Sequence, residues 1–262
     1  MNNTQINADA IWQSIRKEAL DISVSELMLA QLLKLTVLDC STIFECIAVR
    51  ISRKLGKNAV SAQDFQKVFM EAFDADEQIR NNIVADLVAI NLRDPACDSY
   101  LTPILYFKGF QSITTHRVAH WLWMNNRKAL AYYLQSLSSE VFGVDIHPAA
   151  VFGGGILLDH ATSFVAGETS VVEDNVSILH EVTLGGTGNE TGDRHPKVRS
   201  GVLIGAGAKL IGNITIGKGA KIGAGSVVLD NVAEHTTVAG VPAKPIGVPQ
   251  EENPATNMNQ RV

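Results

Sequence analysis

The sequence is poor in several features that mark common classes of protein. Its three cysteines, Cys40, Cys46 and Cys97, show no C-x-x-C spacing, so we expect neither a disulfide framework nor a structural zinc site. The net charge of −5 provides no basic field that would attract nucleic acid. No apolar run reaches the length of a membrane span, and the N-terminus lacks the charged and then apolar pattern of a signal sequence. These absences predict a cytoplasmic protein without membrane or nucleic-acid partners.

Several motifs of nucleotide binding and covalent catalysis are also missing. Neither G-x-x-x-x-G-K-[ST] nor a strand–G-x-G-x-x-G–helix pattern occurs, which excludes P-loop and Rossmann phosphate sites. There is no G-x-S-x-G elbow and no plausible nucleophilic cysteine, so any group transfer is expected to be direct. Aromatic residues are 6% of the chain and hydrophobic residues 46%, which indicates an aliphatic core.

What the sequence does contain is a repeat of six residues. From about residue 146 onward, an aliphatic residue, or a residue in its place, recurs every six positions. This period fits neither an amphipathic helix nor an alternating strand, and it is typical of a parallel β-helix whose six-residue units each form a short strand and a corner. The repeated positions, expected to form one core column, are Ile146, Phe152, Leu158, Phe164, Ser170, Val176 and Val182, then Val198, Ile204, Leu210, Ile216, Ile222 and Val228.

The repeat is interrupted once, between Val182 and Val198. These positions are sixteen residues apart, which is one hexapeptide plus ten residues. The extra stretch, 188–197, reads GNETGDRHPK and is polar, so we expect it to form a loop extruded from the coil. Loops on rigid scaffolds often carry function, and this one contains Arg194 and His195.

Residues 1 to about 140 have helical patterns and predict six to eight helices. Ser23 with Glu26, and Ser61 with Asp64, have the spacing of a capping box at the start of a helix. A run of leucines, at 27, 29, 32 and 33, is expected to be core, with a surplus that could cover an oligomer interface.

The two patterns together predict an α+β protein. We expect an α-helical oligomerisation domain at 1–141, a parallel β-helix at 142–247 with the loop 188–197, and a flexible C-terminal tail at 248–262.

Four polar clusters could carry chemistry: Arg-Asp-Pro at 93–95, Asp-Ile-His-Pro at 145–148, Asp-His at 159–160, and Asp-Arg-His-Pro-Lys at 193–197. A histidine beside a carboxylate is the common arrangement of a general base, and His160 has Asp145 and Asp159 as candidate partners. His160 and His195 are the strongest candidates because each adjoins charged residues at a break in the aliphatic pattern. The helical pair His116 and His120 is more simply a packed pair, since no third ligand is near in sequence.

Longer segments of the chain resemble one family closely. They are RDPA at 93–96, TPILYFKGFQ at 102–111, VDIHPAA at 144–150, LDHAT at 158–162, SILHEVTLGGTG at 177–188 and DRHPK at 193–197, followed by IGAGAKLIGNITIG, IGAGSVVL and AGVPAKPIG. With these segments the chain resembles the serine O-acetyltransferases over nearly its whole length. The resemblance implies a left-handed parallel β-helix behind a helical domain, assembled as a homohexamer that is a dimer of trimers. It also implies acetyl transfer from acetyl-CoA to L-serine, the first step of L-cysteine biosynthesis, with feedback inhibition by L-cysteine.

The resemblance also implies roles for individual residues. His160 would be the general base, oriented by Asp145, with His195 completing the site. The residues expected around the serine are Asp94, Pro95 and Asp159 near its ammonium group and Arg194 at its carboxylate. The residues expected along the coenzyme A groove are Gly186, Thr187, Ala206, Ala224 and Lys244. No metal is implied.

Relatives often end in a longer tail whose terminal isoleucine inserts into O-acetylserine sulfhydrylase. This sequence ends in Val262 after a short tail, so the resemblance leaves that partnership open.

Three other readings remain. A hexapeptide acyltransferase with a different acceptor would leave Asp94 and Arg194 unexplained. A γ-type carbonic anhydrase would need three histidines on zinc, for which His160, His180 and His195 can be proposed. A β-helix without catalytic activity, acting as a scaffold or regulatory partner, would show no turnover.

Overall fold

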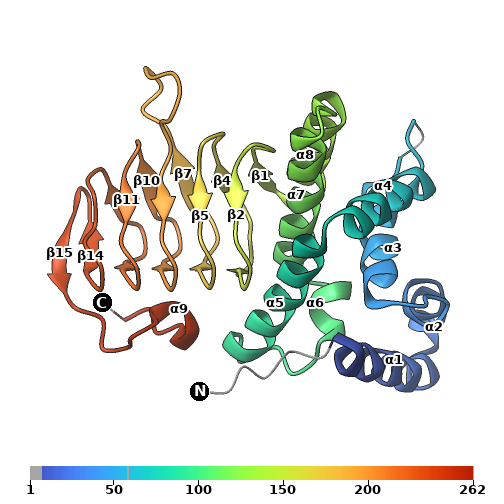
Figure 1. Cartoon of the computed structure of the whole chain (residues 1–262). Helices are drawn as coiled ribbons and strands as arrows, with labels where there is room; N and C mark the ends of the chain where they lie inside the picture. Colours follow the sequence, from blue (N-terminus) through green and yellow to red (C-terminus); the bar gives the residue numbers. More distant parts are fainter. Residues whose placement is uncertain (1–7, 58, 262) are drawn as a thin grey trace.

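The computed structural model describes residues 8–57 and 59–261 and shows two regions (Figure 1). A group of helices is followed by a parallel β-solenoid of about five turns, from whose coil one loop projects (Figure 1). The predicted order of an α-helical region and a parallel β-helix is therefore confirmed.

Eight α-helices precede the coil in the part of the chain that the structure describes. They are α1 (Ala8–Ser25), α2 (Leu27–Leu33), α3 (Ile43–Leu55), α4 (Ala62–Ala75), α5 (Glu77–Arg93), α6 (Leu101–Leu105), α7 (Lys108–Met124) and α8 (Lys128–Phe142), with a π-helical segment at Lys34–Leu38. The capping box of Ser61 and Asp64 is present at the start of α4. The capping box predicted at Ser23 is wrong, because α1 continues through this residue and the Ser23 hydroxyl donates to the Leu20 carbonyl at 2.7 Å within the helix.

The junction of α1 and α2 exposes an apolar strip. Leu27, expected in the core, is 78% exposed, and Met28 is 91% exposed. Leu20 and Val24, on α1, are also exposed, whereas Leu33 is fully buried. The leucine run is therefore only partly core, and the strip is free of contacts within the described chain that would bury it.

The strands form three parallel sheets, one for each face of the coil. Sheet A contains β1 (Val144–Ile146), β4 (Phe164–Ala166), β7 (Thr183–Gly185), β10 (Lys209–Ile211) and β13 (Val227–Val228). Sheet B contains β2 (Val151–Phe152), β5 (Val171–Val172), β8 (Lys197–Val198) and β11 (Thr215–Ile216). Sheet C contains β3 (Leu157–Leu158), β6 (Ser177–Ile178), β9 (Leu203–Ile204), β12 (Lys221–Ile222), β14 (Thr237–Gly240) and the antiparallel β15 (Ala243–Gly247).

The strand register corrects the predicted length of the interruption. Leu158 pairs with Ile178, twenty residues on, whereas Ile204 pairs with Ile222 after the regular eighteen. Leu184 pairs with Leu210 after twenty-six. Two extra residues therefore lie between β3 and β4, and eight rather than ten lie between β7 and β8.

The sequence pattern missed this shift because two columns of buried side chains line the coil. The side chains of one column occupy the paired strand positions, such as Leu158 and Ile178. Those of the other lie two positions earlier, and Val176 and Val182 belong to it. Both columns are buried and largely aliphatic. When two residues are inserted, the period of six in the sequence therefore continues from a position of one column to a position of the other, and the insertion leaves no gap in the pattern.

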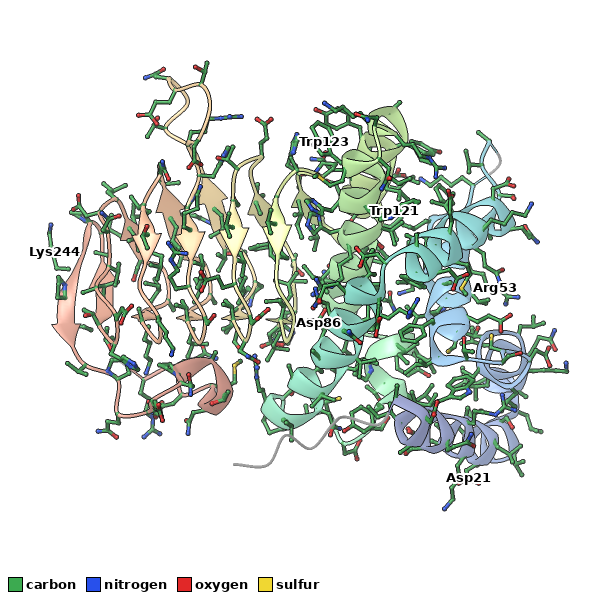
Figure 2. All side chains as sticks on the ribbon, in the orientation of Figure 1. Asp21, Arg53, Asp86, Trp121, Trp123 and Lys244 are labelled. Carbon is green, nitrogen blue, oxygen red and sulfur yellow. The ribbon has the colours of Figure 1, made fainter. Side chains whose placement is uncertain are left out.

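A buried ion pair between α5 and α7 also makes hydrogen bonds to the first turn of the coil, and Figure 2 labels its acidic partner, Asp86. Arg117 on α7 donates to Asp86 on α5 at 2.7 Å and to the carbonyls of Phe152 and Gly153 at 3.1 and 2.7 Å. Asp86 also accepts the amide hydrogen of Ile156 at 2.7 Å. Burial raises the pKa of Asp86, while Arg117 and the amide donors act in the opposite direction. This network fixes α5 and α7 against the coil, next to the sites described below.

The C-terminal segment differs from the flexible tail that was expected. It contains α9 (Pro254–Asn257), which folds back along the coil toward α5 (Figure 1). Pro254 and Ala255 are buried, and the Ser177 hydroxyl donates to the Ala255 carbonyl at 2.7 Å. Val262 lies outside the described residues.

Candidate active site

A cavity of about 870 Å³ brings four of the predicted site residues together. Asp94, Pro95, Asp159 and His160 line it, where the end of α5, the start of α7 and the corner after β3 meet. The C-terminal segment contributes the remaining wall with Asn257, Met258 and Gln260.

His160 lies in the two-residue expansion of the coil. Its φ is 55°, and Ala161 and Ser163 have φ of 60° and 61°, so three non-glycine residues in this corner adopt the left-handed conformation. Each such residue costs on the order of 1–3 kcal/mol, and such strain tends to be concentrated at functional sites. The expansion carries the His160 side chain outward, where it is 73% exposed, and its Nε2 lies 3.9 Å from the Asp159 carboxylate.

The start of α7 is pressed against this corner. A Cβ on Gly109 would fall 1.9 Å from the Leu158 carbonyl oxygen, so only glycine allows the helix to approach the strand so closely. Next to it, Lys108 donates to the Thr162 hydroxyl at 2.5 Å. The helical region therefore helps to hold the backbone that carries His160.

The turn with Asp94 is anchored by the preceding arginine. Arg93 is buried and donates to the Gly155 carbonyl at 3.0 Å and to Ser177 and Asn175 side chains at 3.1 Å each. Burial lowers the pKa of Arg93 to about 10, which still leaves it charged at neutral pH. Its contacts fix the end of α5 on the coil and thereby place Asp94 at the cavity.

His160 begins a column of side chains along one corner of the coil, here called the C–A corner because it follows the sheet C strands. The register places His180, Ala206 and Ala224 at the equivalent position of the next three turns. The rings of His160 and His180 meet edge to face with centroids 5.7 Å apart. Beyond them the two alanines leave a shallow surface along the corner.

Arg194 and His195 lie at a different corner, here called the A–B corner because it follows the sheet A strands. Arg194 donates to the Glu168 carboxylate at 2.7 Å, and this hydrogen bond lowers the pKa of Glu168. The Thr169 hydroxyl accepts the amide hydrogens of Arg194 and His195 at 3.0 and 3.1 Å. Lys197 donates to the carbonyls of Thr169 and His195 at 2.8 Å each. The base of the predicted loop is thus tied to the corner after β4.

Asp145 is not in contact with His160 within the described chain. It lies on β1 and accepts a hydrogen bond from Gln135 of α8 at 2.7 Å. It faces a separate hollow of about 520 Å³ lined mainly by α8. The predicted pairing of Asp145 with His160 is therefore not made within one subunit.

The residues expected along the coenzyme A groove are also divided. Ala206 and Ala224 belong to the C–A corner with His160. Gly186 lies against Arg194 and His195 at the A–B corner, and Thr187 follows it. Lys244, on β15, is exposed at the end of the coil that is farthest from the helices (Figure 2).

Three residues at these sites were not predicted to have a role there: Gln135, Glu168 and Thr169. His180 was considered only as a zinc ligand in the carbonic anhydrase alternative. Glu168 and Thr169 follow Gly167 in the repeat, where they look like ordinary corner residues. Only the pairing of the loop with the corner after β4 shows their contacts. Gln135 had no signal beyond its position on a predicted helix.

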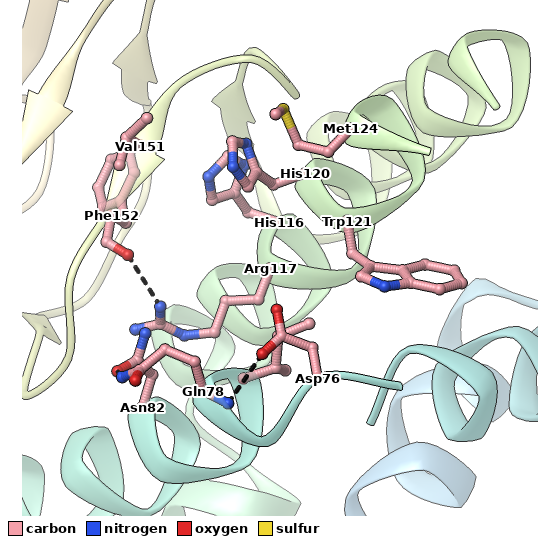
Figure 3. Close-up of a pocket in the computed structure, with 11 residues that line it drawn as sticks. Asp76, Gln78, Asn82, His116, Arg117, His120, Trp121, Met124, Val151 and Phe152 are labelled. Carbon is pink, nitrogen blue, oxygen red and sulfur yellow. Dashed lines mark hydrogen bonds between the residues drawn. The ribbon is translucent and has the colours of Figure 1, made fainter. Parts of the chain in front are cut away.

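The histidine pair of α7 lies elsewhere, at a cavity of about 260 Å³ between α5, α7 and β2 (Figure 3). His120 donates from Nδ1 to the Pro148 carbonyl at 2.8 Å, and His116 is buried against the Phe152 ring. No group of three or more His, Cys, Asp or Glu side chains among the described residues is arranged to hold a metal ion. None of the helices described is long and apolar enough to cross a membrane.

Comparisons with known proteins agree on one family. The model of "Serine acetyltransferase, N-terminal" matches residues 11–115, and that of "Bacterial transferase hexapeptide (six repeats)" matches residues 195–230. Serine acetyltransferase of Salmonella typhimurium is 49% identical over 252 residues, covering 96% of this chain and 92% of the relative.

Solved structures extend the match to the fold. The crystal structure of serine acetyltransferase from Vibrio cholerae has a TM-score of 0.95 at 49% identity and covers 97% of this chain and 98% of its own. The serine acetyltransferase of Brucella abortus in complex with coenzyme A has a TM-score of 0.90 at 52% identity, covering 91% and 96%.

Proposed function

Because the chain belongs to the serine acetyltransferase family and is therefore an acyltransferase, we propose that it transfers the acetyl group of acetyl-CoA to the hydroxyl of L-serine. The products are O-acetyl-L-serine and coenzyme A. Similar proteins have been solved with coenzyme A, with serine and with cysteine bound, which supports these ligands here. The observation that carries the proposal is the cavity in which His160 lies beside the carboxylates of Asp94 and Asp159.

The chemistry needs one base and one acid, and His160 can serve as both. Its imidazole removes the proton of the serine hydroxyl while the oxygen attacks the thioester carbonyl carbon. The tetrahedral intermediate then breaks its carbon–sulfur bond, and the imidazolium returns the proton to the coenzyme A thiolate. The exposed position of His160 leaves its ring accessible to both substrates.

The acceptor is a zwitterion, and the charged residues match its two ends. Asp94 and Asp159, with Pro95 in the same turn, lie beside His160 and can hold the ammonium group. Arg194 has the planar fork that binds a carboxylate through two hydrogen bonds. It is already paired with Glu168, so binding of the substrate carboxylate shifts or shares that contact.

These residues lie at two corners of one coil, which supports an active site shared between subunits. In this arrangement the C–A corner of one subunit, with His160, faces the A–B corner of its neighbour, with Arg194 and His195. Asp145 of the partner subunit then orients His160. Coenzyme A extends along the column of Ala206 and Ala224, with Gly186, Thr187 and Lys244 as further contacts.

Such sharing requires more than one subunit, and the proposed arrangement is a trimer closed in a ring. The exposed apolar strip of α1 and α2 supports further association into a homohexamer. L-Cysteine differs from L-serine only by sulfur in place of oxygen, so it is proposed to inhibit by occupying the same site. All three cysteines are free and buried, which supports a reducing cytoplasm as the place of action. A complex with O-acetylserine sulfhydrylase depends on Val262 and stays a prediction.

The direct test is release of coenzyme A, followed with a thiol reagent, from acetyl-CoA and L-serine with and without micromolar L-cysteine. Turnover that requires serine and falls with cysteine is expected. Because cysteine itself reacts with the reagent, O-acetylserine is also measured by mass spectrometry. A folded oligomer without serine-dependent turnover would contradict the proposal.

A further inference from the structure

Thr169 surrounds His195 with hydrogen bonds at the A–B corner. Its backbone N–H donates to the Nδ1 of His195 at 3.2 Å, and its hydroxyl oxygen lies 2.9 Å from the same nitrogen. That oxygen also accepts the amide hydrogens of Arg194 and His195. One residue therefore contacts both the ring and the backbone of His195.

These contacts determine which nitrogen of His195 carries the proton. A backbone N–H can only donate, so the Nδ1 of His195 must be an acceptor. The Thr169 hydroxyl accepts two amide hydrogens, and the acceptors near its own hydrogen are Nδ1 and the Asp193 carboxylate, whose pKa is lowered by hydrogen bonds from Lys197 and from Thr169. The backbone N–H of Thr169 therefore fixes Nδ1 as an acceptor, and the hydroxyl anchors the backbone that carries the ring. A neutral imidazole with an accepting Nδ1 carries its proton on Nε2.

The surroundings of His195 keep it neutral. The residue is 7% exposed, and its burial lowers its pKa, as do the neighbouring Arg194 and Lys197 in turn. Glu168 acts in the opposite direction and His147 adds a small lowering effect. The ring is therefore a neutral donor at neutral pH.

The Nε2 side of the ring faces two glycines. A Cβ on Gly167 would fall 1.9 Å from Nε2, and one on Gly186 would fall 3.4 Å from it. Gly167 is therefore needed for the ring to lie in this position. None of the described residues accepts a hydrogen bond from Nε2, so its proton is available to a ligand.

We propose that Thr169 is a positioning residue that fixes His195 as a neutral imidazole with its proton on Nε2. His195 then serves as a hydrogen-bond donor to an anionic oxygen and not as a second base. The identity of that oxygen rests on the proposed function: it belongs either to the amino-acid carboxylate or to the thioester carbonyl as it becomes negative during attack. In both cases the donor is oriented before the substrate arrives, which is the condition for strong electrostatic stabilisation.

A matched pair of substitutions tests the role of His195. The amide nitrogen of glutamine can reach the position of Nε2, whereas that of asparagine reaches only the position of Nδ1. We expect His195→Gln to keep roughly a tenth or more of kcat/KM, and His195→Asn to lose roughly 10²–10³-fold, the usual cost of removing such a donor. Equal losses in both folded variants would overturn the donor role. A loss in kcat indicates the carbonyl oxygen, and a rise in KM for serine indicates the carboxylate.

A second pair tests Thr169 without relying on activity. Resting protein labelled in its histidine rings with ¹³C and ¹⁵N should show His195 as the Nε2–H tautomer at pH 7, identified by the signals missing in His195→Gln. Thr169→Ser keeps the hydroxyl and should keep this tautomer and kcat to within about threefold. Thr169→Val has nearly the same shape without the hydroxyl. Its backbone N–H still donates to Nδ1, but the hydroxyl contacts to Nδ1 and to the amides of Arg194 and His195 are lost. We expect the fraction of His195 in the Nε2–H form to fall below that in Thr169→Ser, with a kcat that is lower by roughly tenfold.

The outcomes separate this inference from the proposed function. A wild-type spectrum with the proton on Nδ1 would overturn the inference whatever the enzyme catalyses. So would a folded Thr169→Val protein with the wild-type tautomer and rate. The Nε2–H tautomer in a protein without serine turnover would contradict the proposed function and leave the role of Thr169 standing.

Discussion

The two histidines of the proposed site have opposite environments. His160 is 73% exposed at its side chain, lies on left-handed backbone and has the Asp159 carboxylate 3.9 Å from its Nε2. His195 is 7% exposed and has its Nδ1 held by two groups of Thr169. A base must be reached by both substrates and must change its protonation state, whereas a donor works best when it is fixed. The difference in burial therefore matches a difference in chemical task.

The largest effect is expected from removing the base. His160→Asn deletes the imidazole, and asparagine tolerates the left-handed backbone better than most residues. Because a positioned base contributes roughly 10²–10⁴-fold, kcat should fall by about that factor. His160→Ala should show the same loss of activity with some added strain.

Circular dichroism and size-exclusion chromatography check that both variants fold and assemble. A folded His160→Asn protein with wild-type turnover would show that His160 is not the base. The difference in burial between His160 and His195 would then not reflect a difference in chemical task.

The next prediction tests whether the two corners belong to different subunits. Neither His160→Asn nor Arg194→Ala should be active alone. Subunits unfolded together and refolded as mixed trimers should form some sites with both corners intact, about a quarter of them for random mixing of a cyclic trimer. Activity should therefore return to a fraction of wild type.

The matched control is a mixture of His160→Asn with His160→Ala, which should remain inactive. If the first mixture stays as inactive as this control, although mixed oligomers are detected by mass spectrometry, the site lies within one subunit.

A smaller effect is expected at Gln135, which donates to Asp145 at 2.7 Å. Gln135→Leu removes this donor and leaves Asp145 free to rotate, so the orientation of His160 should suffer and kcat should fall by about tenfold with little change in KM. Ser139→Ala, in the same hollow, is the control and should be close to wild type. Equal kinetics for the two variants would show that Gln135 has no positioning role.

The smallest effect concerns Glu168. The Arg194 hydrogen bond lowers its pKa from the usual 4.5, so the carboxylate stabilises the fold above that value and this contribution is lost as the pH falls below it. The pair is partly exposed, so the contribution at pH 7 should be about 0.2–1 kcal/mol.

Glu168→Gln should therefore lower the free energy of unfolding slightly at pH 7, with the difference from wild type fading toward pH 3. Denaturant titrations at both pH values measure this. A difference that grows at low pH would contradict the assigned sign.

The sequence predicted the architecture well because a period of six residues is specific to stacked coils. The cap at Ser61 was also predicted, since it depends only on local spacing. Leu27 was wrongly assigned to the core. The sequence shows that a residue is apolar but not whether it is buried within its own chain or lies on the surface of that chain.

The sequence offered candidate residues for the site but not their arrangement. His160 and Asp94 share a cavity because the buried contacts of Arg93 bring α5 to the coil, and no local pattern encodes those contacts. Thr169 could not be recognised because its role depends on a loop that returns to the coil twenty-five residues later. The register shift near His160 was hidden by the two aliphatic columns of the coil.

The corner at residues 160–163 shows where such a coil can lengthen without harm. An odd insertion within a strand would turn every following side chain to the other face. Here two added residues are absorbed in the corner itself, and Ile178 and Ile204 still stack on Leu158 in the turns that follow. A corner is thus a place where evolution, or a protein engineer, can vary length and introduce a new reactive group while the interior of the molecule is inherited unchanged.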